Sequence, residues 1–336
     1  MKAVMVTGPG QVEMVDVPEP TVGPRDILVR PKACGICGSD LYYIAIGGIP
    51  PRQGSTILGH EAAGEIVEVG AEVTGLSVGD HVVVNPMADP MGIIGNGGPT
   101  GALSELLVIR DAVVGRSVRV VPMDLPWDVA ALNEPMAVAL HAVNQSRLPA
   151  GGKAVVFGAG PIGLGAAIGY KALGAEHVVV VDILPGRLDK ALAVGADAVI
   201  NSAQEDVRER LFELHGTAAD GLGHPRPGTD VYLDAAGVPA VIDTVMMCAK
   251  HRARLSIPAV HKKPVPVDFG AVLASEVEIV TSMGYPTEIF EVTDHIVARP
   301  EEYGAIISDR FDFAHALDAF TLAQTPGAAE KIVITF

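Results

Sequence analysis

The chain has 336 residues, a length that corresponds to about two domains of ~150 residues each. Its hydrophobic fraction of 49%, with 38 glycines and 25 prolines, indicates a compact α/β protein rich in turns rather than a disordered chain. The formal net charge of −16 disfavours nucleic acids and anionic membrane surfaces as partners, because both repel a net anion. The sequence shows no run of ~20 apolar residues and no secretory leader. Its three cysteines do not suit a disulfide framework, so a cytoplasmic location is expected.

The N-terminal part of the chain predicts a β-rich domain. Runs of β-branched residues bounded by Gly, Pro and Asp predict strands at residues 26–33, 62–70 and 80–86. Short strands separated by turns are typical of an all-β, barrel-like domain. Segment 85–102, rich in Gly, Pro and Asn, predicts a long loop, and such loops in compact domains are usually functional or mobile.

From residue 148 onward, apolar strands alternate with helix-length segments. The predicted strands of this region lie at residues 154–158, 177–182, 197–201, 229–237, 254–259 and 276–282. Buried runs of this kind indicate a parallel sheet with helices on both faces. Segment 215–230 predicts a surface connection within this domain.

The end of the chain predicts a return to the first domain, through a helical segment at 287–299 and a closing strand at 331–336. We therefore expect the first domain to consist of residues 1–147 together with 283–336. The second domain is expected at residues 148–282.

The turn after the first strand of the second domain predicts a dinucleotide site. The cofactor-binding candidates in this turn are Gly158, Gly160, Pro161, Ile162 and Gly163. The three glycines have the G-x-G-x-x-G spacing, which permits a tight turn, close approach of a pyrophosphate and close packing of helix on strand. Asp182 ends the next strand, where a carboxylate binds the adenosine ribose and repels a 2′-phosphate, so NAD is predicted rather than NADP. The alternative is that these glycines only let a helix pack closely.

The Cys34-x-x-Cys37 spacing allows three kinds of site. A four-cysteine zinc ribbon needs a second pair, but Cys248 stands alone. A thioredoxin-like dithiol belongs at a helix start beside a βαβ unit, whereas this pair follows a strand in a β-rich region. The remaining possibility is a catalytic metal with ligands elsewhere, for which His60, Glu61 and Glu134 are candidates.

Four motifs occur in one order along the chain: CGICGSD (34–40), GHEAAGEIVEVG (59–70), NEPMAVALHA (133–142) and GAGPIGLGAA (158–167). In these motifs the chain resembles the zinc-dependent medium-chain dehydrogenase/reductase family, over essentially its whole length. The Glu-Pro motif is most similar to the polyol branch, which includes sorbitol and butanediol dehydrogenases. The resemblance implies an α/β fold with a Rossmann-type doubly wound parallel sheet domain and a β-rich, GroES-like catalytic domain.

The resemblance also implies a catalytic zinc site. Cys37 and His60 are its expected ligands, whereas Cys34 is expected to be a small buried residue. Glu61 and Glu134 are both expected near the metal, with one of them bound in any given state. Segment 85–102, where many members hold a second, structural zinc, contains neither Cys nor His, so one zinc per chain is expected.

Further roles follow from the same resemblance. Asp40 is expected to orient His60, and Ser39 to take the alcohol proton first. The family commonly has His at the position of Tyr42, and a phenol is a poor proton relay at neutral pH. Either water ends the relay, or Tyr42 and Tyr43 shape the substrate pocket instead. A third possibility is that Tyr42 is simply a packing residue. Arg187 is expected along the adenosine edge.

The predicted function is oxidation of a secondary alcohol, diol or polyol by NAD, with zinc as the Lewis acid. A metal-free NAD(P)H-dependent reductase of activated alkenes or quinones is the alternative on the same fold, and a nucleotide-binding protein without catalysis is a third possibility. A homo-oligomer, either a dimer or a tetramer, is expected by resemblance, with segment 276–282 pairing across a two-fold axis.

Overall fold

The computed structural model describes residues 1–325 and 327–336, which divide into two compact units. Unit 1 comprises Met1–Pro135 and Ile289–Phe336, and unit 2 comprises Met136–Glu288. These boundaries differ from those expected at residues 147 and 282. Helix α3 (Asn133–Ser146) accounts for the difference, because its side chains hold the far end of unit 2: His141 Nδ1 lies 3.0 Å from Glu288 Oε1.

Unit 1 is built on two sheets. The larger, seven-stranded sheet has the order β17-β18-β3-β5-β6-β8, and β7 also pairs with β3. Its strands are β17 (Asp309–Asp312), β18 (Ile332–Thr335), β3 (Ile27–Gly35), β5 (Glu61–Val69), β6 (His81–Val84), β8 (Val118–Val120) and β7 (Leu107–Ile109). The smaller sheet consists of β2 (Gln11–Asp16), β1 (Lys2–Gly8) and β4 (Thr56–Ile57).

The helices of unit 1 are short and lie around these sheets. They are α1 (Gly38–Ile46), α2 (Trp127–Ala130), α9 (Glu291–Ala298), α10 (Pro300–Gly304) and α11 (Ala316–Ala323), with 3₁₀ turns at Pro86–Ala88 and Phe313–His315. The core joins apolar side chains from both sheets to α11, among them Val4, Ile66 and Phe320. Strand β18 pairs with β3 in antiparallel fashion, so the C-terminal strand completes the sheet that the N-terminal part of the chain begins.

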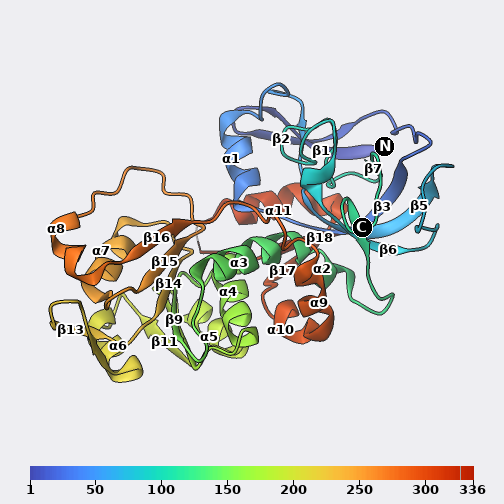
Figure 1. Ribbon diagram of the computed structural model, residues 1–336. Helices are drawn as coiled ribbons and strands as arrows, with labels where there is room; N and C mark the ends of the chain where they lie inside the picture. Colours follow the sequence, from blue (N-terminus) through green and yellow to red (C-terminus); the bar gives the residue numbers. More distant parts are fainter. Residues whose placement is uncertain (326) are drawn as a thin grey trace. The chain divides into compact units, whose positions relative to one another are not determined.

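Unit 2 contains a parallel sheet of the order β11-β10-β9-β14-β15-β16, and Figure 1 shows part of it as β9, β14, β15 and β16. All six strands predicted for this region occur in it, as β9 (Lys153–Phe157), β10 (His177–Asp182), β11 (Ala198–Asn201), β14 (Val231–Asp234), β15 (Arg254–Ile257) and β16 (Glu278–Thr281). Besides α3, the helices are α4 (Pro161–Ala172), α5 (Pro185–Ala193), α6 (Val207–His215), α7 (Pro239–Cys248) and α8 (Phe269–Val272), with a 3₁₀ turn at Leu273–Ser275.

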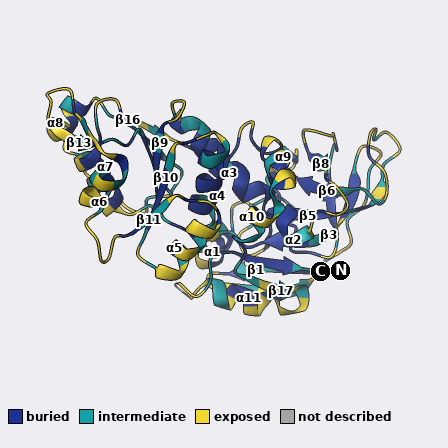
Figure 2. Cartoon of the chain, turned by 90° about the horizontal axis from the view of Figure 1, so that it is seen from below, coloured by how far each residue is buried: buried dark blue, intermediate teal, exposed yellow. Residues whose placement is uncertain are grey.

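Both faces of the parallel sheet are covered, as its nearly continuous apolar strands predict. On one face Val155 and Tyr232 join a buried cluster with Leu211 of α6 and Val245 of α7. On the other face α3 and α4 pack together, and Ser256 Oγ of β15 donates a hydrogen bond to the Ala142 carbonyl of α3. Figure 2 shows β9 and β10 as buried and the outer faces of α5 and α6 as exposed, whereas the edge strand β16 is largely exposed.

Two segments differ from the sequence expectation. The connection at 215–230 forms a small antiparallel hairpin of β12 (Thr217–Ala219) and β13 (Pro225–Pro227). The strand expected at 229–237 ends at Asp234, because this carboxylate accepts hydrogen bonds from the backbone N–H groups of Ala236 and Gly237 and so turns the chain. Within the described part of the chain, no helix has the length and apolarity needed to cross a membrane.

Candidate active site

Three of the predicted metal ligands lie together in unit 1, at the meeting point of β3, α1 and β5. Cys37 follows β3 and is the N-cap residue of α1. His60 and Glu61 stand at the start of β5, which pairs with β3 so that Gly35 lies opposite Glu61. The antiparallel register therefore brings these side chains to one place although they come from two separate motifs.

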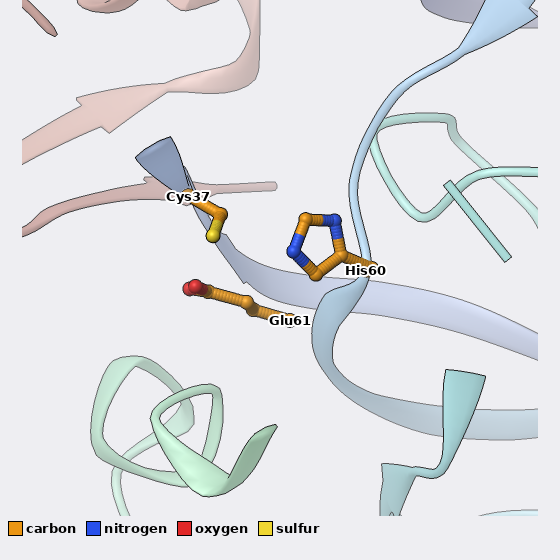
Figure 3. A group of neighbouring side chains, drawn as sticks. All are labelled: Cys37, His60 and Glu61. Carbon is orange, nitrogen blue, oxygen red and sulfur yellow. The ribbon is translucent and has the colours of Figure 1, made fainter. Parts of the chain in front are cut away.

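The group has the composition of a transition-metal site. One ligand atom each from Cys37, His60 and Glu61 lies within 4.8 Å of the others, and Figure 3 shows the three side chains converging. Cysteine sulfur, histidine nitrogen and carboxylate oxygen are the donors that zinc takes in proteins, and three of them leave a fourth position for substrate. The residues present therefore fit the predicted metal. Cys34 is fully buried, and burial raises the pKa of its thiol, which suits a packing residue rather than a metal ligand.

Asp40, in the first turn of α1, lies beside this group. Its Oδ2 accepts a hydrogen bond of 2.9 Å from the Cys37 backbone N–H, and its Oδ1 lies 3.5 Å from His60 Nδ1. Burial alone would lower the pKa of His60, but the charges of Asp40 and Cys37 outweigh it and raise that pKa well above its usual value. Because a metal ion binds neutral imidazole, metal binding by His60 would release the proton that the raised pKa retains.

Of the residues that follow Cys37, Ser39 and Tyr43 lie on the side of His60, whereas Tyr42 is exposed to solvent. Ser39 Oγ lies 3.5 Å from His60 Nε2, where the predicted proton acceptor should stand. Tyr43 is buried, and burial raises the pKa of its phenol although Ser39 hydrogen-bonds to it. Tyr42 is 62% exposed, so its side chain projects away from the core of unit 1.

Sequence reasoning missed Lys331. Its Nζ is buried, donates a hydrogen bond of 3.0 Å to the Ile36 carbonyl oxygen and forms an ion pair with Glu61 Oε2. Burial would lower the pKa of Lys331, but the charge of Glu61 raises it. A lysine that precedes a strand is usually exposed, so its residue type gave no signal of burial. Only the pairing of the closing strand could have placed Lys331 near Glu61.

Glu134 is the predicted ligand that lies outside the group of three. It stands in the first turn of α3 and is 9% exposed. Its charge also contributes to the raised pKa of Lys331, after those of Glu61 and Cys37. In this structure Glu61, and not Glu134, is the carboxylate beside Cys37 and His60.

The glycine-rich turn in unit 2 has the predicted form. Helix α4 begins with Pro161 and Ile162 directly after the N-cap residue Gly160. A Cβ at Gly160 would meet nothing within 4 Å, which leaves space for a ligand at the helix N-terminus. A Cβ at Gly163 would overlap the Gly158 carbonyl oxygen, so close packing of helix on turn requires glycine there.

Asp182 ends β10 beside this turn. Its Oδ2 accepts a hydrogen bond of 2.7 Å from Ala159 N–H, and its Oδ1 accepts from Ile183 and Leu184 N–H at 2.7 and 2.9 Å. The carboxylate therefore ties the glycine-rich turn to the end of the next strand. Arg187 follows in the first turn of α5 and is half-buried.

Comparison with known proteins identifies the family. Residues 23–117 match the alcohol dehydrogenase GroES-like domain, and residues 161–298 match the zinc-binding dehydrogenase domain. The (R,R)-butanediol dehydrogenase of Neisseria gonorrhoeae is 33% identical over 85% of this chain and 84% of its own length. The chain belongs to the zinc-type medium-chain dehydrogenase family. Sorbitol dehydrogenase of Bombyx mori is 28% identical over 99% of this chain and 97% of its own.

Solved structures give the same result. The crystal structure of 2R,3R-butanediol dehydrogenase from Bacillus subtilis superimposes with a TM-score of 0.88 at 27% identity, covering 100% of this chain and 99% of that one. A zinc-binding dehydrogenase from Sinorhizobium meliloti, determined with NADP bound, has a TM-score of 0.84 at 25% identity over 100% and 99% of the two chains. The predicted family, its polyol branch, the fold class and the assignment to the alcohol-oxidising dehydrogenases are confirmed.

Proposed function

We propose that this dehydrogenase oxidises a secondary alcohol, a vicinal diol or a polyol to the ketone, with NAD as the hydride acceptor and one catalytic zinc per chain. The observation that carries the proposal is the convergence of Cys37, His60 and Glu61 within 4.8 Å in unit 1. The names of the butanediol and sorbitol dehydrogenases to which the chain is similar support this substrate class.

Cys37, His60 and one carboxylate would hold the metal, and Glu61 is the carboxylate that lies with the other two residues in this structure. The charge of Glu134 acts on the same buried lysine, Lys331, as that of Glu61. When bound, zinc supplies Lewis acidity for removing the alcohol proton, and the nicotinamide supplies the hydride acceptor. Asp40 fixes the backbone of Cys37 and lies beside the His60 ring, which keeps both donors in place. Ser39 Oγ, 3.5 Å from His60 Nε2, would accept the proton of the alcohol and pass its own hydroxyl proton on towards water.

A single zinc per chain is proposed because the residues that could hold a second are absent from segment 85–102, whose 18 positions include neither Cys nor His. Among the described residues, Cys37, His60 and Glu61 form the one group with metal-ligand composition and spacing.

NAD is proposed over NADP because Asp182 places a carboxylate where the 2′-phosphate would lie. A carboxylate can accept hydrogen bonds from the ribose hydroxyls but repels a phosphate dianion. Gly158, Gly160 and Gly163, with Pro161 and Ile162, form the pyrophosphate turn, and Arg187 lies beyond it on α5.

A homo-oligomer, either a dimer or a tetramer, is proposed through β16. This strand ends the order of the parallel sheet, and an edge strand is a template for pairing with a second chain. Ile279 on β16 is 44% exposed, and a cavity of about 550 Å³ beside it is lined largely by apolar side chains, including Ile242 and Ile257. A cytoplasmic location, expected from the three free cysteines, stays a prediction.

The test is a panel of primary alcohols, secondary alcohols and vicinal diols assayed with NAD and with NADP, read by the absorbance of the reduced nicotinamide. We expect turnover of secondary alcohols or diols with NAD, and close to one zinc per chain by elemental analysis. Cys37→Ala should lower kcat/KM at least ~10³-fold, since Lewis-acid catalysis contributes several kcal/mol, while NADH binding persists. Cys248→Ala, in unit 2, is the matched control.

Other outcomes would replace the proposal. Full activity of Cys37→Ala would exclude a role for the metal group. NADPH-dependent reduction of an alkene or quinone by the zinc-free protein would favour the alternative reductase. A zinc content near two per chain would show a second metal site.

A further inference from the structure

We propose that the loop at residues 85–102 positions the metal ligand His60, with Gly95 as its point of contact and the Asp89–Arg110 ion pair as its anchor. The inference rests on the proposed metal site but concerns a separate part of unit 1. The loop contacts the backbone at Gly59–His60 directly.

The loop packs on the peptide that carries His60. Gly95 approaches it so closely that a Cβ there would overlap the Gly59 carbonyl oxygen and lie 2.9 Å from His60 N. The end of the same loop makes a hydrogen bond to this peptide, because Ala102 N–H donates to the Gly59 carbonyl oxygen at 2.8 Å. The carbonyl that precedes His60 is thus held by the loop through one hydrogen bond and one close contact.

The opposite side of Gly59 is also closed. Gly59 has φ +95°, and a Cβ there would lie 2.8 Å from Leu103 Cγ and 3.0 Å from Cys34 Sγ. Leu103 N–H donates to the Leu58 carbonyl oxygen at 3.0 Å, which holds the preceding residue too. We therefore expect a displacement of the loop to pass through Gly59 to His60.

An ion pair between a buried aspartate and a partly exposed arginine anchors the loop to the sheet. Asp89 Oδ2 lies 3.2 Å from Arg110 Nη1, and its Oδ1 accepts a hydrogen bond of 2.8 Å from Met91 N–H. The Asp89 side chain is fully buried. Arg110 directly follows β7, which pairs with β3, the strand that leads to Cys37. The ion pair thus links the loop to β3, the strand that leads to Cys37.

Asn85 fixes the start of the loop. Its side-chain oxygen accepts from Met87 N–H at 3.1 Å, and its side-chain amide donates to the Arg116 carbonyl oxygen at 2.9 Å. With both ends and the Asp89 anchor held, Gly95 has a defined place against Gly59. Residues that orient a metal ligand in this way typically affect metal affinity by about 10- to 100-fold.

The test compares glycine substitutions within the one loop. Gly95, Gly92 and Gly97 all have positive φ, at +68°, +118° and +84°, so alanine strains the backbone at each of them. Only Gly95 faces the Gly59–His60 peptide: at Gly92 the added Cβ would meet Gly98 Cα at 3.3 Å, and at Gly97 it would meet Ile49 Cγ2 at 3.0 Å. Gly92→Ala and Gly97→Ala are therefore matched controls.

The readouts are zinc affinity, measured by competition with a chromogenic chelator, and the visible spectrum of the cobalt-substituted protein. We expect Gly95→Ala to weaken zinc binding about 10- to 100-fold and to shift the cobalt bands, with NADH affinity unchanged. The two controls should match wild type in both measurements. Equal zinc affinity and equal spectra for all three variants would overturn the proposal.

The anchor gives a second test that does not depend on the folding of Gly95→Ala. Arg110→Met should weaken zinc binding in the same direction, and Arg110→Lys, which keeps the charge beside Asp89, should restore most of it. If Arg110→Met and wild type bind zinc equally, the anchor has no positioning role. Failure of the wild-type protein to bind zinc at all would instead refute the proposed function, and so the two failures are distinguishable.

Discussion

Lys331 forms a buried ion pair with Glu61, a residue 270 positions earlier in the chain. The side chains of Lys331 and Glu61 are 2% and 1% exposed. The lysine is placed by β18, which pairs with β3 so that Ile36 N–H donates to the Ile332 carbonyl oxygen. A cation is thus present beside the carboxylate of the metal group before any metal binds.

Lys331→Met should destabilise the metal-free protein far more than the zinc-loaded protein. Removing one partner leaves the Glu61 carboxylate buried and unpaired, which typically costs about 3–5 kcal/mol. Zinc beside Glu61 supplies a replacement positive charge, so its addition should recover much of that loss. Chemical denaturation with and without zinc measures this difference.

The control for this variant is Lys2→Met, which breaks the exposed pair of Lys2 with Asp16 and should change stability by ~0–1 kcal/mol. An equal loss for Lys331→Met with and without zinc would mean that the metal does not interact with Glu61.

Glu61→Gln and Glu134→Gln should differ in their effect on metal binding. Since Glu61 lies with Cys37 and His60 and Glu134 lies outside that group, we expect Glu61→Gln to weaken zinc binding more strongly. Both variants should reduce turnover, because both carboxylates contribute to the electrostatic field at the buried Lys331. Zinc titration and steady-state kinetics of the two variants show which carboxylate binds the metal. Weaker zinc binding in Glu134→Gln than in Glu61→Gln would make Glu134 the working ligand.

Asp182→Asn should raise the activity with NADP relative to NAD. The amide oxygen can still accept from Ile183 and Leu184 N–H, but the hydrogen bond from Ala159 N–H to the second carboxylate oxygen is lost. The substitution removes the charge that repels the 2′-phosphate. The ratio of kcat/KM values for the two cofactors is the measurement. Asp189→Asn, an exposed carboxylate on α5, is the control. A wild-type enzyme that already prefers NADP would contradict the assignment of Asp182.

His215 should make the stability of unit 2 fall in mildly acidic solution. Burial, reinforced by the charges of His177 and Lys153, lowers the pKa of His215 to about 4. Because the unfolded chain has a histidine pKa of about 6.5, it binds more protons than the folded chain between those values. The stability due to neutral His215 is thus complete above pH ~6.5 and is lost as the pH falls towards 4.

The expected loss is on the order of 3 kcal/mol. His215→Gln should flatten this part of the profile of unfolding free energy against pH, whereas His315→Gln, at an exposed histidine, should leave it unchanged. Parallel profiles for wild type and His215→Gln between pH 6.5 and 4 would show that His215 is not buried in its neutral form.

The glycine-rich turn and the parallel sheet could be predicted from the sequence because their signals are local. The spacing of Gly158, Gly160 and Gly163 after an apolar strand, and Asp182 at the end of the next one, describe a single βαβ unit. The group of Cys37, His60 and Glu61 was predicted through the resemblance of its motifs to a family. Cys37 follows β3 and His60 precedes β5, and no short-range pattern specifies that these two strands pair.

The sequence by itself determined the family, the two kinds of domain and the residue types of both sites, because these reside in contiguous motifs with fixed periodicity. Only the tertiary structure decided which carboxylate lies with Cys37 and His60, that Lys331 pairs with it, and that Gly95 packs against the Gly59–His60 peptide. These contacts join segments far apart in the chain, and they depend on strand register and on the path of a loop. A lysine before a strand and a glycine in a loop have the same local sequence signal whether they face solvent or a metal site.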